Sequence, residues 1–258
     1  MISFVGAGPG DSDLITVKGL KLLNAADVII YAGSLVSKDI LSGIKEGAKV
    51  FDSAKMTLEE VVDEFIKAEE AGLNTVRLHT GDPSIYGAIK EQIDTLDLLG
   101  YEYEVIPGVT SATAACARIA KEFTLPEVSQ TLIITRMEGR TKVPETEKLA
   151  ELAKHKTSMA IYLSASLTEK VQEALLEGYE DPNTPVVIAY KATWADEKII
   201  YTSIANLVKD AKENNITKHA LILVGKFINA RYERSKLYDP SFSTEYRKAN
   251  EKNHHHLH

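Results

Sequence analysis

The sequence predicts an α/β protein with two α/β domains and a ligand cleft between them, the N-terminal domain around a mainly parallel sheet and the C-terminal domain around a mixed sheet. From the first residue onward, short apolar runs alternate with amphipathic stretches, which is the pattern of β-α-β units. Glycine-containing loops directly follow three of these runs. In the second half, two apolar runs are separated only by a short loop around Trp194, as in a β-hairpin. Antiparallel pairing at this hairpin is what makes the second sheet mixed.

Four apolar runs in the first half predict strands, and the stretches between them predict helices. The strands are expected at residues 2–5, 27–31, 75–79 and 103–106. Helices are expected near residues 16–24, 58–71, 85–98 and 110–120, the last of them rich in small side chains. Thr16, Thr57 and Ser84 stand at expected N-caps, and Gly72 and Gly100 stand at expected C-caps.

The second half begins after a proline-bearing stretch, residues 122–127, where we expect the linker. Its strands are expected at residues 131–135, 159–163, 186–191, 198–202 and 220–225, and its helices near residues 145–153, 168–177 and 205–213. The sequence therefore predicts an N-terminal domain at residues 1–122, a C-terminal domain at residues 123–230 and a flexible tail at residues 231–258. Histidines 254–256 and 258 could in principle bind a metal, but they follow a polar run without a packing pattern, and we assign no metal site.

The composition is that of an ordinary globular protein. The 258 residues are 44% hydrophobic and 26% charged, which suffices for one large domain or two smaller ones. The formal net charge of −7 argues against non-specific binding of nucleic acid. The single cysteine, Cys116, excludes an internal disulfide and a Cys-based zinc cluster. We expect a cytoplasmic protein with no membrane-spanning segment and no signal peptide.

The first loop, residues 6–11, is close to a dinucleotide-binding fingerprint but does not complete it. Asp11 stands where the third glycine of the fingerprint is needed, and its carboxylate would face a pyrophosphate. Pro9 removes one backbone N–H from a phosphate cradle. A cationic or uncharged ligand therefore suits this loop better than a phosphate.

Two further loops, residues 80–83 and 107–111, also follow predicted strands. Because ligands of open α/β sheets bind beyond the carboxyl ends of the strands, we expect the three loops to share one crevice. There the Asp82 carboxylate could bind an amino group or ribose hydroxyls, or simply start a turn. Thr110 and Ser111 are expected both to cap a helix and to line the crevice. His79 could contact a ligand or act as acid or base, although a satisfied structural histidine is the commoner outcome.

Several cations follow strands of the second half. Arg136, Arg140 and Lys142 lie in one loop, where guanidinium groups could bind carboxylates or simply be solvated. Lys191 precedes Trp194 in a loop that could be no more than a hairpin with one packed aromatic. Cys116 is interpreted as a small buried residue, because no histidine lies near it in sequence. The motifs of serine hydrolases, zinc proteases and P-loop enzymes are absent from the sequence.

The three loops at residues 6–11, 80–83 and 107–112 together resemble the tetrapyrrole methyltransferase family. The resemblance extends over roughly the first 230 residues. Within the family, the chain is most similar to enzymes that methylate carbon 11 of a precorrin in cobalamin biosynthesis. That similarity is carried by residues 13–19, 31–36, 79–87, 135–141 and 190–199, of which the last two segments distinguish this branch best.

The resemblance implies a cofactor, a substrate and an assembly. It implies S-adenosylmethionine as methyl donor, S-adenosylhomocysteine as product, a reduced tetrapyrrole with or without cobalt as substrate, and a homodimer. It places the cofactor against Pro9, Thr80, Gly81, Asp82, Ile85, Thr110 and Ser111, and against second-domain strand ends near Leu163, Ala192, Ala220 and Leu221. The acidic side chains of the substrate would meet Arg136, Arg140 and Lys191, with His79 beside them. No metal ligand and no catalytic base is assigned.

Three alternatives stay open at this point. The chain could methylate another position of a precorrin, or it could bind a tetrapyrrole without catalysis. A nucleotide-dependent oxidoreductase would need an acidic residue about twenty residues after the first loop to bind the ribose. Asp27 lies near that distance but begins a predicted strand instead of ending one.

Overall fold

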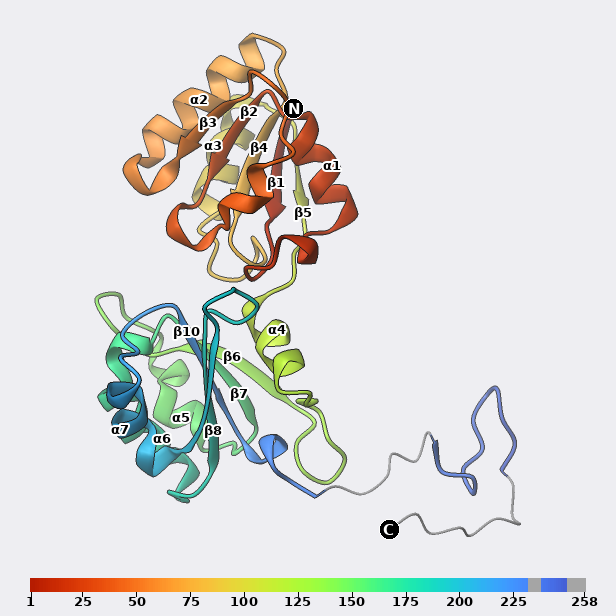
Figure 1. The fold of residues 1–258 in the computed structure, drawn as a ribbon, viewed down its shortest axis with the longest axis vertical. Helices are drawn as coiled ribbons and strands as arrows, with labels where there is room; N and C mark the ends of the chain where they lie inside the picture. Colours follow the sequence, from red (N-terminus) through yellow and green to blue (C-terminus); the bar gives the residue numbers. More distant parts are fainter. Residues whose placement is uncertain (232–237, 250–258) are drawn as a thin grey trace.

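The computed structural model describes residues 1–231 and 238–249, which contain two α/β units with a five-stranded sheet each (Figure 1). The sheet of the N-terminal unit has the order β3-β2-β4-β1-β5 and is parallel throughout. Its strands are β1 (Ile2–Gly6), β2 (Val28–Tyr31), β3 (Lys49–Asp52), β4 (Thr75–His79) and β5 (Tyr103–Ile106). The short edge strand β3 had no counterpart in the predicted elements.

The sheet of the C-terminal unit has the order β6-β7-β10-β8-β9. Its strands are β6 (Leu132–Arg136), β7 (Ser158–Tyr162), β8 (Pro185–Tyr190), β9 (Lys198–Ser203) and β10 (Ala220–Val224). Only β6 and β7 pair in parallel, and β8 and β9 form the expected hairpin. The predicted fold class, two α/β units with one parallel and one mixed sheet, is confirmed.

Helices cover both faces of each sheet (Figure 1). In the N-terminal unit, α1 (Val17–Ala25) covers one face, and α2 (Leu58–Glu70) and α3 (Lys90–Leu99) cover the other. Successive residues of β1 therefore enter different cores: Phe4 packs with Phe65 of α2, whereas Val5 lies in the core that contains Leu23 of α1. This alternation follows from the two-residue period of a strand.

In the C-terminal unit, α4 (Ser111–Arg118) covers one face, and α5 (Leu149–Ala153), α6 (Thr168–Tyr179) and α7 (Leu207–Glu213) cover the other. The small side chains Ala112 and Ala115 of α4 share a core with Ala160 of β7. By its packing, α4 thus belongs to the second unit. The division at residue 122 remains a prediction, and the packing of α4 supports an earlier boundary, at residues 107–110.

Most of the expected caps are present. The Thr16 hydroxyl accepts a hydrogen bond from the Gly19 N–H at 3.0 Å, and Thr57 forms a capping box with Glu60. The predicted cap at Ser84 is wrong, because α3 begins only at Lys90. Left-handed residues between these two positions, Tyr86 and Ala88 with φ of 55° and 50°, prevent a helix from starting at Ser84.

Part of the predicted tail, residues 232–237 and 250–258 with the C-terminal histidines, lies outside the described residues. Among the residues that the structure does describe, no helix combines the length and the apolar character needed to cross a membrane.

Candidate functional site

The three glycine loops meet backbone to backbone at the carboxyl edge of the first sheet. The Gly81 N–H donates to the Gly8 carbonyl at 2.8 Å, and the Gly8 N–H donates to the Gly81 carbonyl at 3.3 Å. A Cβ atom on Gly6 would lie 2.5 Å from the Gly81 oxygen, and one on Gly108 would lie 2.1 Å from the same atom. These glycines are required because no side chain fits between the loops. We call this contact of Gly6, Gly8, Gly81 and Gly108 the glycine junction.

Asp82 ties two loops of the glycine junction together. Its Oδ1 accepts a hydrogen bond from the Ser84 N–H at 2.8 Å, and its Oδ2 accepts one from the Gly108 N–H at 2.9 Å. The first bond forms the turn that the sequence predicted as one of two possibilities. The second bond joins residues 80–83 to residues 107–111, a link that sequence spacing did not reveal.

Trp194 connects the C-terminal unit to the first glycine loop. Its indole Nε1–H donates to the Pro9 carbonyl oxygen at 2.9 Å. A Cβ atom on Gly10 would lie 2.2 Å from the indole, so Gly10 leaves the space that this ring occupies. The aromatic side chain is therefore more than a packed hairpin residue, because it joins the two units.

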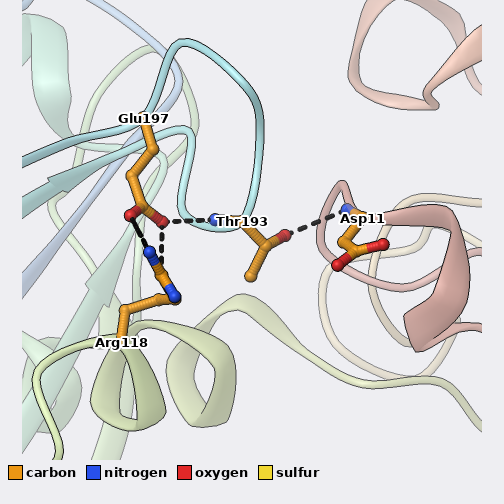
Figure 2. A network of polar contacts seen from close by, with 4 residues as sticks. All are labelled: Asp11, Arg118, Thr193 and Glu197. Atoms are coloured by element: carbon orange, nitrogen blue, oxygen red, sulfur yellow. Dashed lines mark hydrogen bonds and ion pairs between the residues drawn. The ribbon is translucent and has the colours of Figure 1, made fainter.

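A chain of polar contacts runs from one unit to the other near this indole (Figure 2). The Asp11 N–H donates to Thr193 Oγ1 at 3.0 Å, and the Thr193 N–H donates to Glu197 Oε2 at 2.6 Å. Arg118, at the end of α4, donates to both carboxylate oxygens of Glu197 at 2.8 to 3.0 Å. Bidentate pairs of this kind fix orientation as well as distance. The Arg118–Glu197 pair fixes the β8–β9 loop on α4, and the bond from Asp11 to Thr193 joins that loop to the first glycine loop.

A cavity of about 510 Å³ lies between the two units. We call it the cleft cavity. Every residue to which the family resemblance assigned the cofactor lines it, namely Pro9, Thr80, Gly81, Asp82, Ile85, Thr110, Ser111, Leu163, Ala192, Ala220 and Leu221. The prediction that the three glycine loops share one crevice is confirmed. The ligand that these residues hold stays a prediction.

Tyr162 is a lining residue that sequence reasoning missed. Its hydroxyl lies 2.5 Å from Thr110 Oγ1 and accepts a hydrogen bond from the Ala112 N–H at 3.0 Å. It thereby takes the capping role that was expected of the Thr110 side chain, which makes no cap of its own. The Tyr86 ring lies 5.4 Å from the Tyr162 ring, centroid to centroid. The position of Tyr162 at a strand end was visible in the sequence, but its partner helix was not.

Of the three cations predicted to bind the substrate, the structure places one in the cleft cavity and two outside its lining. Lys191 lines the cleft cavity and forms an ion pair with Asp196 at 2.7 Å, which raises the pKa of the lysine. Arg136 and Arg140 are not among the residues that line it. The Arg136 guanidinium donates to carbonyl oxygens of its own loop, those of residues 137, 141 and 142, and Arg140 is exposed. The structure therefore does not bring these two arginines to the cavity, and their role in substrate binding stays a prediction.

A second cavity, of about 890 Å³, lies across Trp194 from the cleft cavity. Its lining includes Gly10, Asp11 and Trp194 together with two cations, Lys38 and Lys55, that the sequence analysis did not single out. Both lysines follow strands of the first sheet, but no local pattern marked them. The Trp194 side chain therefore lines both cavities.

His79 lines the cleft cavity and is 97% buried. Its ring stacks on Phe4, with centroids 6.1 Å apart, and its Nε2 has no hydrogen-bond partner among the described residues. Burial, helped by the charge of Arg77, lowers the pKa of His79 from 6.5 to about 3. The imidazole is therefore neutral at physiological pH and does not form an ion pair with a ligand.

This shift predicts a pH dependence of stability. Between pH 3 and 6.5 the unfolded state binds a proton at His79 that the folded state does not, so stability rises with pH across that window and is lost as pH falls. We expect His79 to contribute a loss of roughly 1.5 kcal/mol in unfolding free energy between pH 6.5 and 5. Urea denaturation at both pH values, with wild type and His79→Phe, measures it. Equal losses in the two proteins would contradict the assignment.

Cys116 behaves as expected of a small buried residue. It lies in the core between α4 and the second sheet, and its S–H donates to the Lys121 carbonyl oxygen at 3.1 Å. Burial raises the pKa of the thiol to about 11, so the thiolate is scarce at neutral pH.

Asp27, the acidic residue that an oxidoreductase could use, is not among the described residues that line the cleft cavity. The Asp27 carboxylate pairs with Lys45 and accepts a hydrogen bond from the Asn74 N–H. Asp27 and Asn74 directly precede β2 and β4 and so lie at the amino edge of the sheet. A dinucleotide ribose would lie at the opposite edge, which disfavours that alternative.

A crevice at the carboxyl edge of a parallel sheet, closed by a second α/β unit, is the usual place for a small organic ligand in an α/β protein. The model of the family of Tetrapyrrole (Corrin/Porphyrin) Methylases matches residues 1–208. The chain belongs to this family.

Individual relatives match over nearly their whole length. The chain is 53% identical to a cobalt-precorrin-4 C(11)-methyltransferase of Methanocaldococcus jannaschii, over 97% of each chain. It is 44% identical to a precorrin-4 C(11)-methyltransferase of Pseudomonas aeruginosa, over 92% of this chain and 94% of that one. A crystal structure of a cobalt precorrin-4 methyltransferase superimposes with a TM-score of 0.87 at 50% identity, covering 89% of this chain and 96% of the other.

Proposed function

We propose that this chain transfers a methyl group from S-adenosylmethionine to carbon 11 of precorrin-4, with or without bound cobalt, as the step of cobalamin biosynthesis that leads to precorrin-5. The observation that carries the proposal is the cleft cavity, a ligand site at the carboxyl edge of a parallel sheet in which the glycine junction leaves no phosphate cradle. The identity to relatives named for this reaction supports the choice of acceptor and of carbon 11.

The residues of the cleft cavity suit S-adenosylmethionine in charge and in size. This donor carries a sulfonium and an ammonium group and no phosphate. Asp82 is the one carboxylate among the described lining residues, which also include Arg77, Lys191 and Lys218, so its negative charge favours the cationic groups of the donor locally. The N–H groups of Gly8 and Gly81 are used within the glycine junction, so they do not form a row of free donors for a pyrophosphate. A volume of about 510 Å³ lies within the usual range for small-molecule sites.

The second cavity offers room for a large acceptor. It adjoins the cleft cavity at Trp194, and Lys38 and Lys55 line it together with three carboxylates, those of Asp11, Asp39 and Asp52. With Lys191 in the cleft cavity, these lysines are the proposed partners of the acetate and propionate groups of a tetrapyrrole, which are carboxylates. Arg136 and Arg140 remain further proposed contacts for an acceptor that reaches beyond the two cavities.

Bound S-adenosylmethionine supplies a methyl group activated by the positive sulfur. The electron-rich carbon 11 of the acceptor would attack that methyl in line and release S-adenosylhomocysteine. The work of the protein is then alignment of the two reactants and exclusion of water. Leu163, Ala192 and Leu221 offer apolar surface for this purpose. We assign no general base.

The test is to locate the transferred methyl group. The protein is incubated with S-adenosylmethionine labelled with carbon-13 in the methyl group, and separately with precorrin-4 and cobalt-precorrin-4. We expect one new labelled methyl at carbon 11 of at least one acceptor by NMR. A methyl at another carbon would overturn the position, and binding of both ligands without transfer would favour the non-catalytic alternative.

Assembly and location are proposed alongside the reaction. A homodimer is proposed because the resemblance to the family implies one. The free thiol of Cys116 supports a reducing, cytoplasmic location. Light scattering coupled to size-exclusion chromatography tests the dimer directly.

A further inference from the structure

Arg77 is a buried cation in the wall of the cleft cavity. It lies on β4, two residues before the carboxyl end of the strand, and only 7% of its surface is exposed. Its Nε donates to the Gln92 side-chain oxygen at 3.1 Å, and one terminal nitrogen donates to the Ile30 carbonyl at 3.1 Å. Both partners are neutral, so they position the guanidinium without balancing its charge.

No carboxylate among the described residues forms an ion pair with Arg77. Asp82, the acidic lining residue, already accepts hydrogen bonds from the Ser84 and Gly108 N–H groups. His79, next to Arg77 on the same face of β4, is neutral. Burial accordingly lowers the pKa of Arg77 to about 10. A buried charge without a counter-charge is costly, and an anionic ligand would remove that cost.

The cleft cavity as a whole carries a surplus of positive charge in an acidic chain. Arg77, Lys191 and Lys218 line it against the single Asp82. Lys191 already has Asp196 as its partner, and Lys218 is exposed to solvent, where water screens its charge. Arg77 is therefore the cation of this lining whose charge a ligand would compensate most effectively.

We propose that Arg77 anchors a carboxylate of the bound ligand inside the cleft cavity, through the guanidinium N–H groups that Gln92 and Ile30 leave free. This inference rests on the proposed function, because both reactants carry the required group. The methionine part of the donor ends in a carboxylate, and the acceptor carries acetate and propionate groups. Arg77 is a positioning residue in either case, since it would hold a reactant without touching the reacting carbon.

The test measures binding, so it does not depend on where a methyl group is placed. Calorimetry compares S-adenosylhomocysteine with 5′-methylthioadenosine, which lacks the amino-acid carboxylate. Fluorescence quenching of uroporphyrin III, in the presence of saturating S-adenosylhomocysteine, reports on tetrapyrrole carboxylates. The variants are Arg77→Gln, which removes the charge, and Gln92→Glu, which supplies a carboxylate to Arg77 from within the protein. Gln92→Leu is the matched control, because it loses the same amide without adding a charge.

We expect Arg77→Gln to weaken one carboxylate ligand by about 10- to 100-fold, the effect of losing hydrogen bonds to a charged group. Gln92→Glu should weaken the same ligand more than Gln92→Leu does. If the variant binds S-adenosylhomocysteine more weakly than wild type does but binds 5′-methylthioadenosine equally well, the donor supplies the carboxylate. If the affinity for uroporphyrin III falls while the affinity for S-adenosylhomocysteine is unchanged, the acceptor supplies the carboxylate.

Two results would overturn the proposal. One is that every affinity in Gln92→Glu equals that in Gln92→Leu. The other is an equal loss of both adenosyl ligands in Arg77→Gln, which would mean that the arginine only supports the fold. Should Arg77→Gln fail to fold, the Gln92 pair still decides, because those variants keep the guanidinium. Failure of the proposed function would give a different result from failure of the Arg77 proposal, because the wild-type protein itself would then bind no S-adenosylhomocysteine.

Discussion

Replacing Gly108 with alanine is expected to weaken S-adenosylhomocysteine binding by roughly 100-fold. The added Cβ would lie 2.1 Å from the Gly81 carbonyl oxygen and 2.9 Å from the Gly6 Cα. All of these atoms belong to backbone, so no flexible side chain can move aside and the loops must separate. Overpacking of this kind costs about 3 kcal/mol at the upper end of its usual range. Because this cost falls on the loop arrangement that lines the cleft cavity, we expect it to appear in binding, where about 3 kcal/mol corresponds to a loss of roughly 100-fold. Calorimetry measures the binding, and thermal unfolding measures the stability.

Gly72→Ala is the matched control for this substitution. Gly72 follows α2 with a φ of 67°, and a Cβ there would meet no atom within 4 Å. It should therefore lose about 1 kcal/mol of stability to backbone strain alone and keep its affinity for S-adenosylhomocysteine. Normal binding by Gly108→Ala would show that the glycine junction tolerates a side chain.

Replacing Asp82 with alanine is the second substitution with a large expected effect. It removes the acceptors of the Ser84 and Gly108 N–H groups and the one carboxylate among the described lining residues of the cleft cavity. Hydrogen bonds to a charged group are worth about 1.5 to 3 kcal/mol each. We expect the affinity for S-adenosylhomocysteine to fall by roughly 10- to 100-fold, measured by calorimetry.

Asp181→Ala provides the comparison. The Asp181 carboxylate accepts a hydrogen bond from the Asn183 N–H at 3.0 Å, the same local turn that Asp82 forms with Ser84. Asp181 does not line the cleft cavity. Its loss should therefore leave binding unchanged, and an effect as large as that of Asp82→Ala would mean that any broken turn weakens the site.

Local signals predicted most of the fold. The strands and helices were visible because the periods of apolar residues, about two in strands and 3.6 in helices, are properties of short segments. The Thr16 and Thr57 caps are equally local. The start of α3 was misplaced for the opposite reason. Residues 85–89 have a suitable composition, but Tyr86 and Ala88 adopt left-handed backbone angles within a segment where a Cβ on Gly87 would lie 2.1 Å from the Pro83 carbonyl oxygen.

The candidate site divides in the same way. Loops that follow strands of a parallel sheet must gather at one edge, so the crevice and its lining by Pro9, Asp82 and Thr110 could be predicted from order along the chain. Contacts with the second unit could not. Trp194 reaches Pro9 in the first glycine loop, and Tyr162 reaches Thr110 in the third loop and Ala112 in α4, so both contacts join segments that are far apart in the sequence. Likewise, nothing local showed that Arg136 would turn back to its own loop.

The order of residues along the chain was thus enough to predict two α/β units and one crevice shared by three glycine loops, and the motifs in those loops resemble the methylase family to which the chain belongs. The folded chain decided what each glycine is for: Gly6 and Gly108 admit the Gly81 carbonyl, and Gly10 admits the Trp194 indole. It also decided that Arg77 is buried beside the cavity, where no carboxylate of the described residues forms an ion pair with it. The reason is physical. Periodicity and loop order depend on neighbours in sequence, whereas close packing, burial and charge balance depend on atoms that come together only when distant segments fold.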